Sequence, residues 1–171
     1  MSKEIFLIDA NSLITPYLTY YPFDFAESFW GQMEEHIQNG SIAILDLVKD
    51  EIRQGEDSLK DWMDALTISN YIDRRDPTIL TYYGTVLSHI QTNDCYKSSA
   101  LTEWAKGTVA DPWLISTAKA KGYTIITFEV PNKGLNSRSP SKNAKIPDVA
   151  SVFGVKTANL FYMMRALGFT L

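Results

Sequence analysis

The stretch that decides the fold covers residues 109–129 and reads V-A-D-P-W-L-I-S-T-A-K-A-K-G-Y-T-I-I-T-F-E. Asp111 before Pro112 favours a helix start, because an Asp side chain can accept hydrogen bonds from first-turn amides and Pro loses none there. We therefore expect Asp111 at the helix N-cap. Gly122 predicts the end of this helix, since glycine readily adopts a left-handed backbone. The apolar residues 123–127 then predict a buried strand.

Two further buried strands are predicted nearer the N-terminus. Residues 5–8, I-F-L-I, predict a central parallel strand that ends at Asp9, and residues 41–45, S-I-A-I-L, predict a second, followed by a helix that contains Glu51. Ligands of open α/β sheets bind beyond the carboxyl ends of the strands. The acids expected to meet there are Asp9, Glu51, Asp111 and Glu129. Helix capping or a solvated helix face can also explain each acid singly.

The whole chain, residues 1–171, is expected to form one domain, because its length matches that of a single core. A block of helices is predicted as an insert between the second and third strands, and one of them starts at Asp76, which we interpret as a cap only. Beyond residue 147 we expect a short helix, an edge strand and a last helix that ends at Gly168. These elements predict an α/β fold of three layers, α/β/α, with a central, mainly parallel sheet.

The composition excludes several classes of protein. The hydrophobic fraction of 45% and charged fraction of 21% are ordinary for a globular chain. A single cysteine excludes an internal disulfide, and two histidines argue against a structural zinc site, so any metal is expected to have oxygen ligands. No segment matches a signal peptide or a membrane span, and we expect a cytoplasmic protein without membrane contact.

Basic residues are concentrated in one segment of this acidic chain. The net charge of −4 argues against broad, non-specific binding of nucleic acids. Residues 130–147 form a predicted long loop that has no acid and contains Lys133, Arg138, Lys142 and Lys145. Both a solvated loop and a phosphate-contacting loop are consistent with this pattern. The position of the loop between two acids favours the second interpretation.

Four short segments in this order resemble the PIN-domain family, which includes ribonuclease toxins of the VapC type. They are I-F-L-I-D-A-N-S-L-I, V-K-D-E-I, V-A-D-P-W-L-I-S-T-A-K and T-I-I-T-F-E. The resemblance implies that Asp9, Glu51 and Asp111 are metal-binding acids. It also implies that Asn11 supports the first acid and that Thr127 is the hydroxyl residue two places before the fourth.

The fourth acid departs from the pattern of the family, which commonly has Asp where this chain has Glu129. Asp148, after the basic loop, can replace or join it as a metal ligand. The long helical insert and the loop of residues 130–147 also mark a divergent member. These departures leave open an alternative in which the chain is a catalytically weakened PIN-like module that binds nucleic acid or protein.

The function implied by the resemblance is Mg²⁺- or Mn²⁺-dependent hydrolysis of RNA phosphodiester bonds, with no side-chain nucleophile. The basic residues of the loop would bind flanking phosphates. In a toxin setting, a cognate antitoxin would block the site and a homodimer would be common. Two other enzyme classes fit less well. A haloacid-dehalogenase-type phosphatase requires Asp where this chain has Asn11, and a phospho-receiver domain requires paired acids near the end of the first strand.

Overall fold

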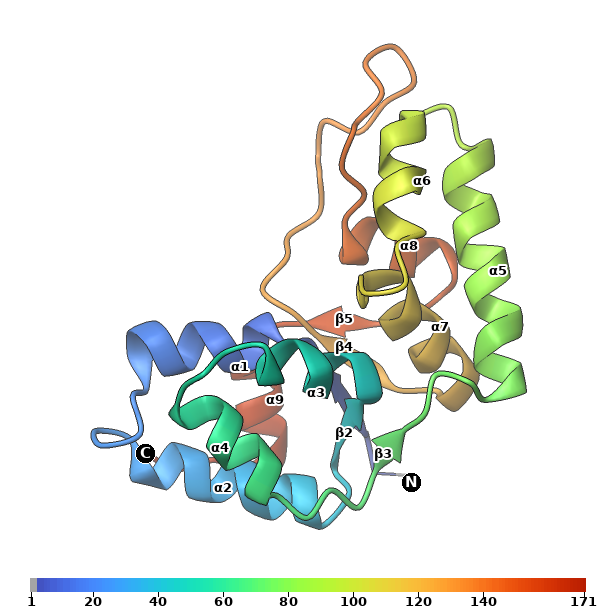
Figure 1. Ribbon diagram of the computed structural model, residues 1–171. Helices are drawn as coiled ribbons and strands as arrows, with labels where there is room; N and C mark the ends of the chain where they lie inside the picture. Colours follow the sequence, from blue (N-terminus) through green and yellow to red (C-terminus); the bar gives the residue numbers. More distant parts are fainter. Residues whose placement is uncertain (1–2) are drawn as a thin grey trace.

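The computed structural model describes residues 3–171, which form a five-stranded sheet in the order β3-β2-β1-β4-β5 (Figure 1). Each neighbouring pair of strands is parallel. The strands are β1 (Phe6–Ile8), β2 (Ile42–Leu45), β3 (Tyr71–Ile72), β4 (Thr124–Ile126) and β5 (Thr157–Ala158). Every residue of β1, β2 and β4 is buried. Their apolar sequences suit strands that are covered on both faces.

Helices cover both faces of the sheet, which confirms the predicted three-layer α/β/α fold (Figure 1). One face carries α1 (Asn11–Thr15), the π-helical turn η1 (Pro16–Tyr20), α2 (Glu27–Gln38), α3 (Asp46–Arg53), α4 (Ser58–Ala65) and α9 (Leu160–Leu167). The other face carries α5 (Pro77–Thr92), α6 (Ser98–Trp104), α7 (Asp111–Lys121) and α8 (Ile146–Val152). No helix within residues 3–171 combines the length and the apolar character that crossing a membrane requires.

The predicted helical insert is interrupted by a strand. Tyr71 and Ile72 form β3, which pairs in parallel with Ile44 and Leu45 of β2. The helices between β2 and β4 therefore form two crossovers instead of one uninterrupted block. A strand of two residues, one of them exposed, is too short to show a strand periodicity in the sequence.

The strand order creates a topological switch point between β1 and β4. From β1 the chain moves outward to β2 and β3 over one face, and it returns to β4 and β5 over the opposite face (Figure 1). The connections that leave β1 and β4 therefore diverge. In open α/β sheets a crevice for ligands forms at this point, beyond the carboxyl ends of the strands. Asp9 directly follows β1, and Thr127 directly follows β4.

The basic loop runs beside the connection between α5 and α6 (Figure 1, orange). The carbonyl of Ser141 accepts a hydrogen bond from the amide of Lys97 over 2.8 Å, and the amide of Ser141 donates to the carbonyl of Cys95 over 2.8 Å. These bonds fix the returning part of the loop. Helix α5 packs along α7, which ends at Gly122 with φ +73°, as predicted.

Candidate active site

Asp9 is buried at the end of β1, and a residue at the end of the neighbouring strand holds its side chain. Its relative exposure is 5%. The hydroxyl of Thr127 donates a hydrogen bond to Oδ2 of Asp9 over 2.9 Å and accepts one from the amide of Glu129 over 3.1 Å. Burial and the charges of Glu51 and Glu129 raise the pKa of Asp9 to about 6, against the effect of the Thr127 hydrogen bond.

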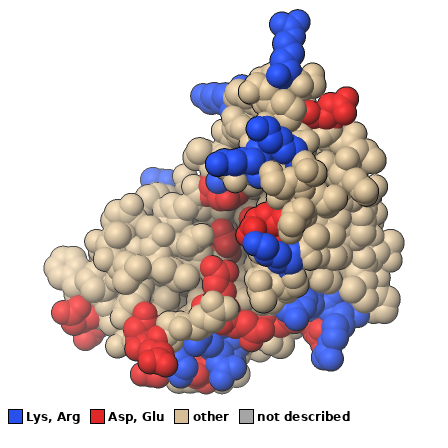
Figure 2. Space-filling view, turned by 45° about the horizontal axis from the view of Figure 1, so that its top comes forward, with Lys and Arg blue, Asp and Glu red and all other residues tan. Residues whose placement is uncertain are grey.

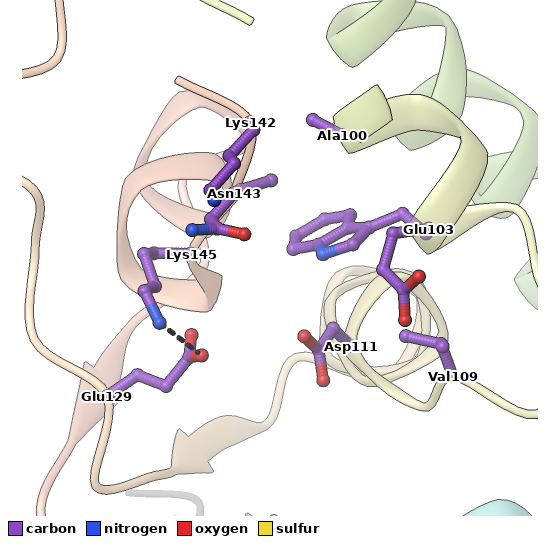
Figure 3. A pocket seen from close by; sticks show the side chains of 10 residues that line it. Ala100, Glu103, Val109, Asp111, Glu129, Lys142, Asn143 and Lys145 are labelled. Carbon is purple, nitrogen blue, oxygen red and sulfur yellow. Dashed lines mark hydrogen bonds and ion pairs between the residues drawn. The ribbon is translucent and has the colours of Figure 1, made fainter. Parts of the chain in front are cut away.

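Asp111 does not cap its helix. The structure places Ala110 at the N-cap with helical backbone angles and shows no side-chain cap, so the predicted cap role of Asp111 is wrong. Because the chain is already helical at residue 110, the Asp111 carboxylate is free to line a cleft, across from Glu129 (Figure 3). Asp76 behaves as predicted. It is an N-cap whose side chain accepts a hydrogen bond from the amide of Thr78 over 2.9 Å.

The acids at this edge of the sheet are close enough to influence one another electrostatically. Burial, together with the charges of Glu129, Asp9 and Glu51, raises the pKa of Asp111 to about 7, while Lys145 acts in the opposite direction. Glu51 is half-buried on α3, and burial raises its pKa as well. We call Asp9, Glu51, Asp111 and Glu129 the acid group. Its members come from β1, α3, α7 and the segment after β4.

Glu129 is tied to the start of α8 by both of its carboxylate oxygens. Oε2 accepts a hydrogen bond from the amide of Ile146 over 2.6 Å, and Oε1 lies 3.3 Å from Nζ of Lys145. The extra methylene of Glu, compared with Asp, lets this side chain span the distance to α8.

Two of the clefts that reach the acid group are lined by both Glu129 and Lys145. One, of about 190 Å³, is lined by Asp111, Glu129 and Lys145 and lies between α6 and the returning loop (Figure 3). The other, of about 340 Å³, is lined by Asp9, Asn11, Glu129 and Lys145. Glu129 and Lys145 therefore border both clefts. Figure 2 shows acidic side chains following the bottom of a groove, with basic side chains at its rim.

The predicted roles of Asn11 and Asp148 are not reflected in their hydrogen bonds. Asn11 is exposed in the larger cleft, and the hydrogen bonds found among residues 3–171 include none between its side chain and Asp9. Thr127 has the supporting contact instead. Both carboxylate oxygens of Asp148 accept a hydrogen bond from the amide of Asn132, over 3.1 and 3.0 Å. The observed contact of Asp148 thus fixes the start of the basic loop.

Only two of the four basic residues in the loop line the smaller cleft. Lys142 and Lys145 line the smaller cleft, whereas Lys133 and Arg138 are exposed and line neither of the two clefts. Glu103 of α6 lines the same cleft and was not predicted. A single acid on an exposed helix face carries no signal in the sequence that separates it from a solvated residue.

The donor atoms of the acid group fit a hard divalent cation by their chemistry. Carboxylate oxygens are preferred ligands of Mg²⁺ and Mn²⁺. Within residues 3–171, no three His, Cys, Asp or Glu side chains converge closely enough in this conformation to ligate one ion. Burial, and after it the charges of neighbouring acids, raise the pKa values of Asp9 and Asp111, and a bound cation would stabilise their charged forms.

Comparisons with known proteins support the assignment of the fold. A family model described as "Domain of unknown function (DUF4411)" matches residues 6–171. A chain in the crystal structure of VapBC2 from Rickettsia felis bound to a DNA fragment from their promoter is similar, with a TM-score of 0.50 and 16% identity. The match covers 91% of this chain and 98% of that chain. No curated protein matches in sequence. The α/β fold is therefore PIN-like.

Proposed function

We propose, from the premise that this chain belongs to the DUF4411 family and has a PIN-like fold, that it is a metal-dependent ribonuclease and the toxin of a toxin–antitoxin pair. The observation that carries the proposal is the acid group at the switch point between β1 and β4. Acids brought from distant segments into repulsive proximity reduce the stability of a fold, and such groups cluster at functional sites. Binding a divalent cation is the simplest such function.

The acid group would hold one or two Mg²⁺ or Mn²⁺ ions. An ion bound there would lower the pKa of a water molecule and neutralise charge on the phosphate. Thr127 orients Asp9 through its hydroxyl, and the Ile146 amide fixes one oxygen of Glu129. Asp148 accepts hydrogen bonds from the amide of Asn132, so we propose that it holds the loop and is not a ligand in this conformation.

The basic residues of the loop support a nucleic-acid substrate, which we propose to be RNA. Lys142 lines the smaller cleft beside Asp111, and exposed Lys133 and Arg138 extend the positive charge away from it. A strand held along this loop would present its backbone to the acid group. The affinity for RNA would then fall as the salt concentration rises, because neutralising phosphates releases counterions.

The partner that we propose for this toxin is a protein antitoxin that covers the acid group and blocks access of RNA. The proposal rests on the similar VapBC2 structure, whose name describes an assembly on promoter DNA. A homodimer is proposed on the same basis. In that setting the protein would act in the cytoplasm.

The decisive experiment is cleavage of a labelled pool of structured RNAs and single-stranded DNA with Mn²⁺, Mg²⁺ or chelator. We expect RNA cleavage with either ion, and loss of cleavage in Asp9→Asn and Asp111→Asn. The matched control is Asp76→Asn, which alters the other Asp-Pro pair yet keeps a side chain that caps helices well. Retained RNA without cleavage under every condition would instead support the binding-module alternative.

A further inference from the structure

Lys145 has a different position from the other basic residues of the loop. It is the N-cap residue of α8, and its side chain lines both clefts of the acid group. Its ammonium lies 3.3 Å from Oε1 of Glu129, and its charge opposes the raised pKa of Asp111. Lys145 is therefore close to the carboxylates of the acid group. Lys133 and Arg138 are exposed and line neither of the two clefts.

The two oxygens of Glu129 are not equivalent. Oε2 accepts the Ile146 amide over 2.6 Å, a bond that also holds the first turn of α8. Oε1 has Lys145 as its partner. Oε1 is therefore the oxygen whose present partner, a mobile ammonium, a cation can replace while the bond between Oε2 and α8 stays in place.

We propose that Lys145 is a built-in counter-ion of the acid group, which a divalent cation must displace from Oε1 of Glu129. The inference rests on the proposed metal-dependent function and adds a competition between side chain and ion. The exchange is feasible because the Lys145 side chain is 42% exposed and can rotate into solvent, while that of Glu129 is 23% exposed. Once displaced, the ammonium would remain at the border of both clefts, within reach of a phosphate.

The test is isothermal titration of the RNA-free protein with Mn²⁺. Lys145→Met removes the competing charge and retains much of the side-chain volume. We expect it to bind Mn²⁺ about two- to fivefold more tightly than the native protein, the gain that corresponds to removing a partly exposed ion pair. Lys145→Gln should show the same gain, and Lys145→Arg should keep the native affinity. Thermal melts establish that each variant is folded.

Lys156→Met is the matched control. Lys156 pairs with Glu4 over 2.9 Å beside β5, so this change removes the same charge from a Lys–Glu pair outside the acid group. Its affinity for Mn²⁺ should equal that of the native protein. Equal or weaker binding by Lys145→Met and Lys145→Gln would overturn the inference, as would an equal gain in Lys156→Met.

Cleavage assays on the same preparations separate this inference from the proposed function. Tighter Mn²⁺ binding in the neutral variants, with no RNA cleavage by the native protein, would uphold the counter-ion and overturn the ribonuclease. Cleavage by the native protein, with equal Mn²⁺ affinities in all the variants, would support the ribonuclease and overturn the counter-ion. No Mn²⁺ binding by any of the proteins would overturn both.

Discussion

Asp9 and Asp111 are negative charges that folding places largely out of water. Their pKa values of about 6 and about 7 exceed the value of about 3.9 expected for Asp in an unfolded chain. The folded protein therefore binds more protons than the unfolded chain between these limits. The free energy of unfolding of the metal-free protein should fall as pH rises from about 4 to about 7. The acids thus reduce stability at the pH at which they would bind a cation.

Asp111→Asn should consequently stabilise the metal-free protein while abolishing cleavage. We expect a gain in the free energy of unfolding on the order of 3 kcal/mol at pH 8, and little change at pH 4. Chemical denaturation in chelator across this pH range measures the gain. Asp61→Asn is the control, since its side chain is 83% exposed and already solvated. A gain of the same size at pH 4 would show that repulsion and burial of charge are not its cause.

The hydrogen bond from the Thr127 hydroxyl to Asp9 is expected to affect the rate of RNA cleavage. Thr127→Val removes the hydrogen bond to Asp9 and leaves the side-chain volume nearly unchanged. A hydrogen bond to a charged group contributes about 1.5–3 kcal/mol, so cleavage should slow about tenfold or more. Thr124→Val, three residues earlier in β4, is the matched control, because the hydroxyl of Thr124 bonds Glu4 outside the acid group. An equal decrease in both variants would mean that strand damage is the cause.

Sequence patterns predicted which acids lie near the site better than they predicted what each side chain does. Asp76 and Asp111 both precede Pro, yet only Asp76 caps its helix. The difference depends on the backbone angles of the preceding residue, which an Asp-Pro pair does not specify. The role of Lys145 likewise depends on where the loop returns, and the sequence of the loop contains no marker of that return.

At the scale of elements, the buried apolar strands and the edge strand near the C-terminus were predictable, and β3 was not. β1, β2 and β4 are runs of buried apolar residues that match their predicted positions within a few residues. β3 was missed because Tyr71 and Ile72 are stabilised as a strand by pairing with β2, which is distant in the sequence. Helix ends marked by Gly122 and Gly168 were predicted correctly, since both have left-handed angles that favour glycine.

The basic loop provides a prediction about the binding of RNA. Replacing both Lys133 and Arg138 by Ala should weaken binding and flatten its dependence on salt, by about 0.7 in the log–log slope for each phosphate that is no longer neutralised. Fluorescence anisotropy at several salt concentrations, in chelator, measures the slope without cleavage. The matched control replaces Lys60 and Lys156, which pair with acids elsewhere, and removes the same net charge. An unchanged slope in the loop variant would contradict the phosphate-contacting role.

At the scale of the whole molecule, the position of the site follows from topology. Parallel strands ordered 3-2-1-4-5 leave one switch point, between β1 and β4. Asp9 follows β1, Glu129 follows β4, and Asp111 is the first residue of α7, the helix that leads into β4. This much could be predicted from the order of strands and acids in the chain. The spacing between carboxylates could not, because it depends on packing between helices far apart in the sequence.

If the acid group binds a cation, adding Mn²⁺ should close most of the difference in stability between the native protein and Asp111→Asn. At a free concentration of about 100 times its Kd, Mn²⁺ should add about 2.7 kcal/mol to the native protein. For a chain of 171 residues, this corresponds to a rise in Tm of roughly 5–10 °C. Asp111→Asn should start from a higher Tm in chelator and show little rise, because it lacks both the repulsion and a ligand for the ion. Equal rises in the two proteins, measured by calorimetry at pH 8, would place the bound Mn²⁺ away from the acid group.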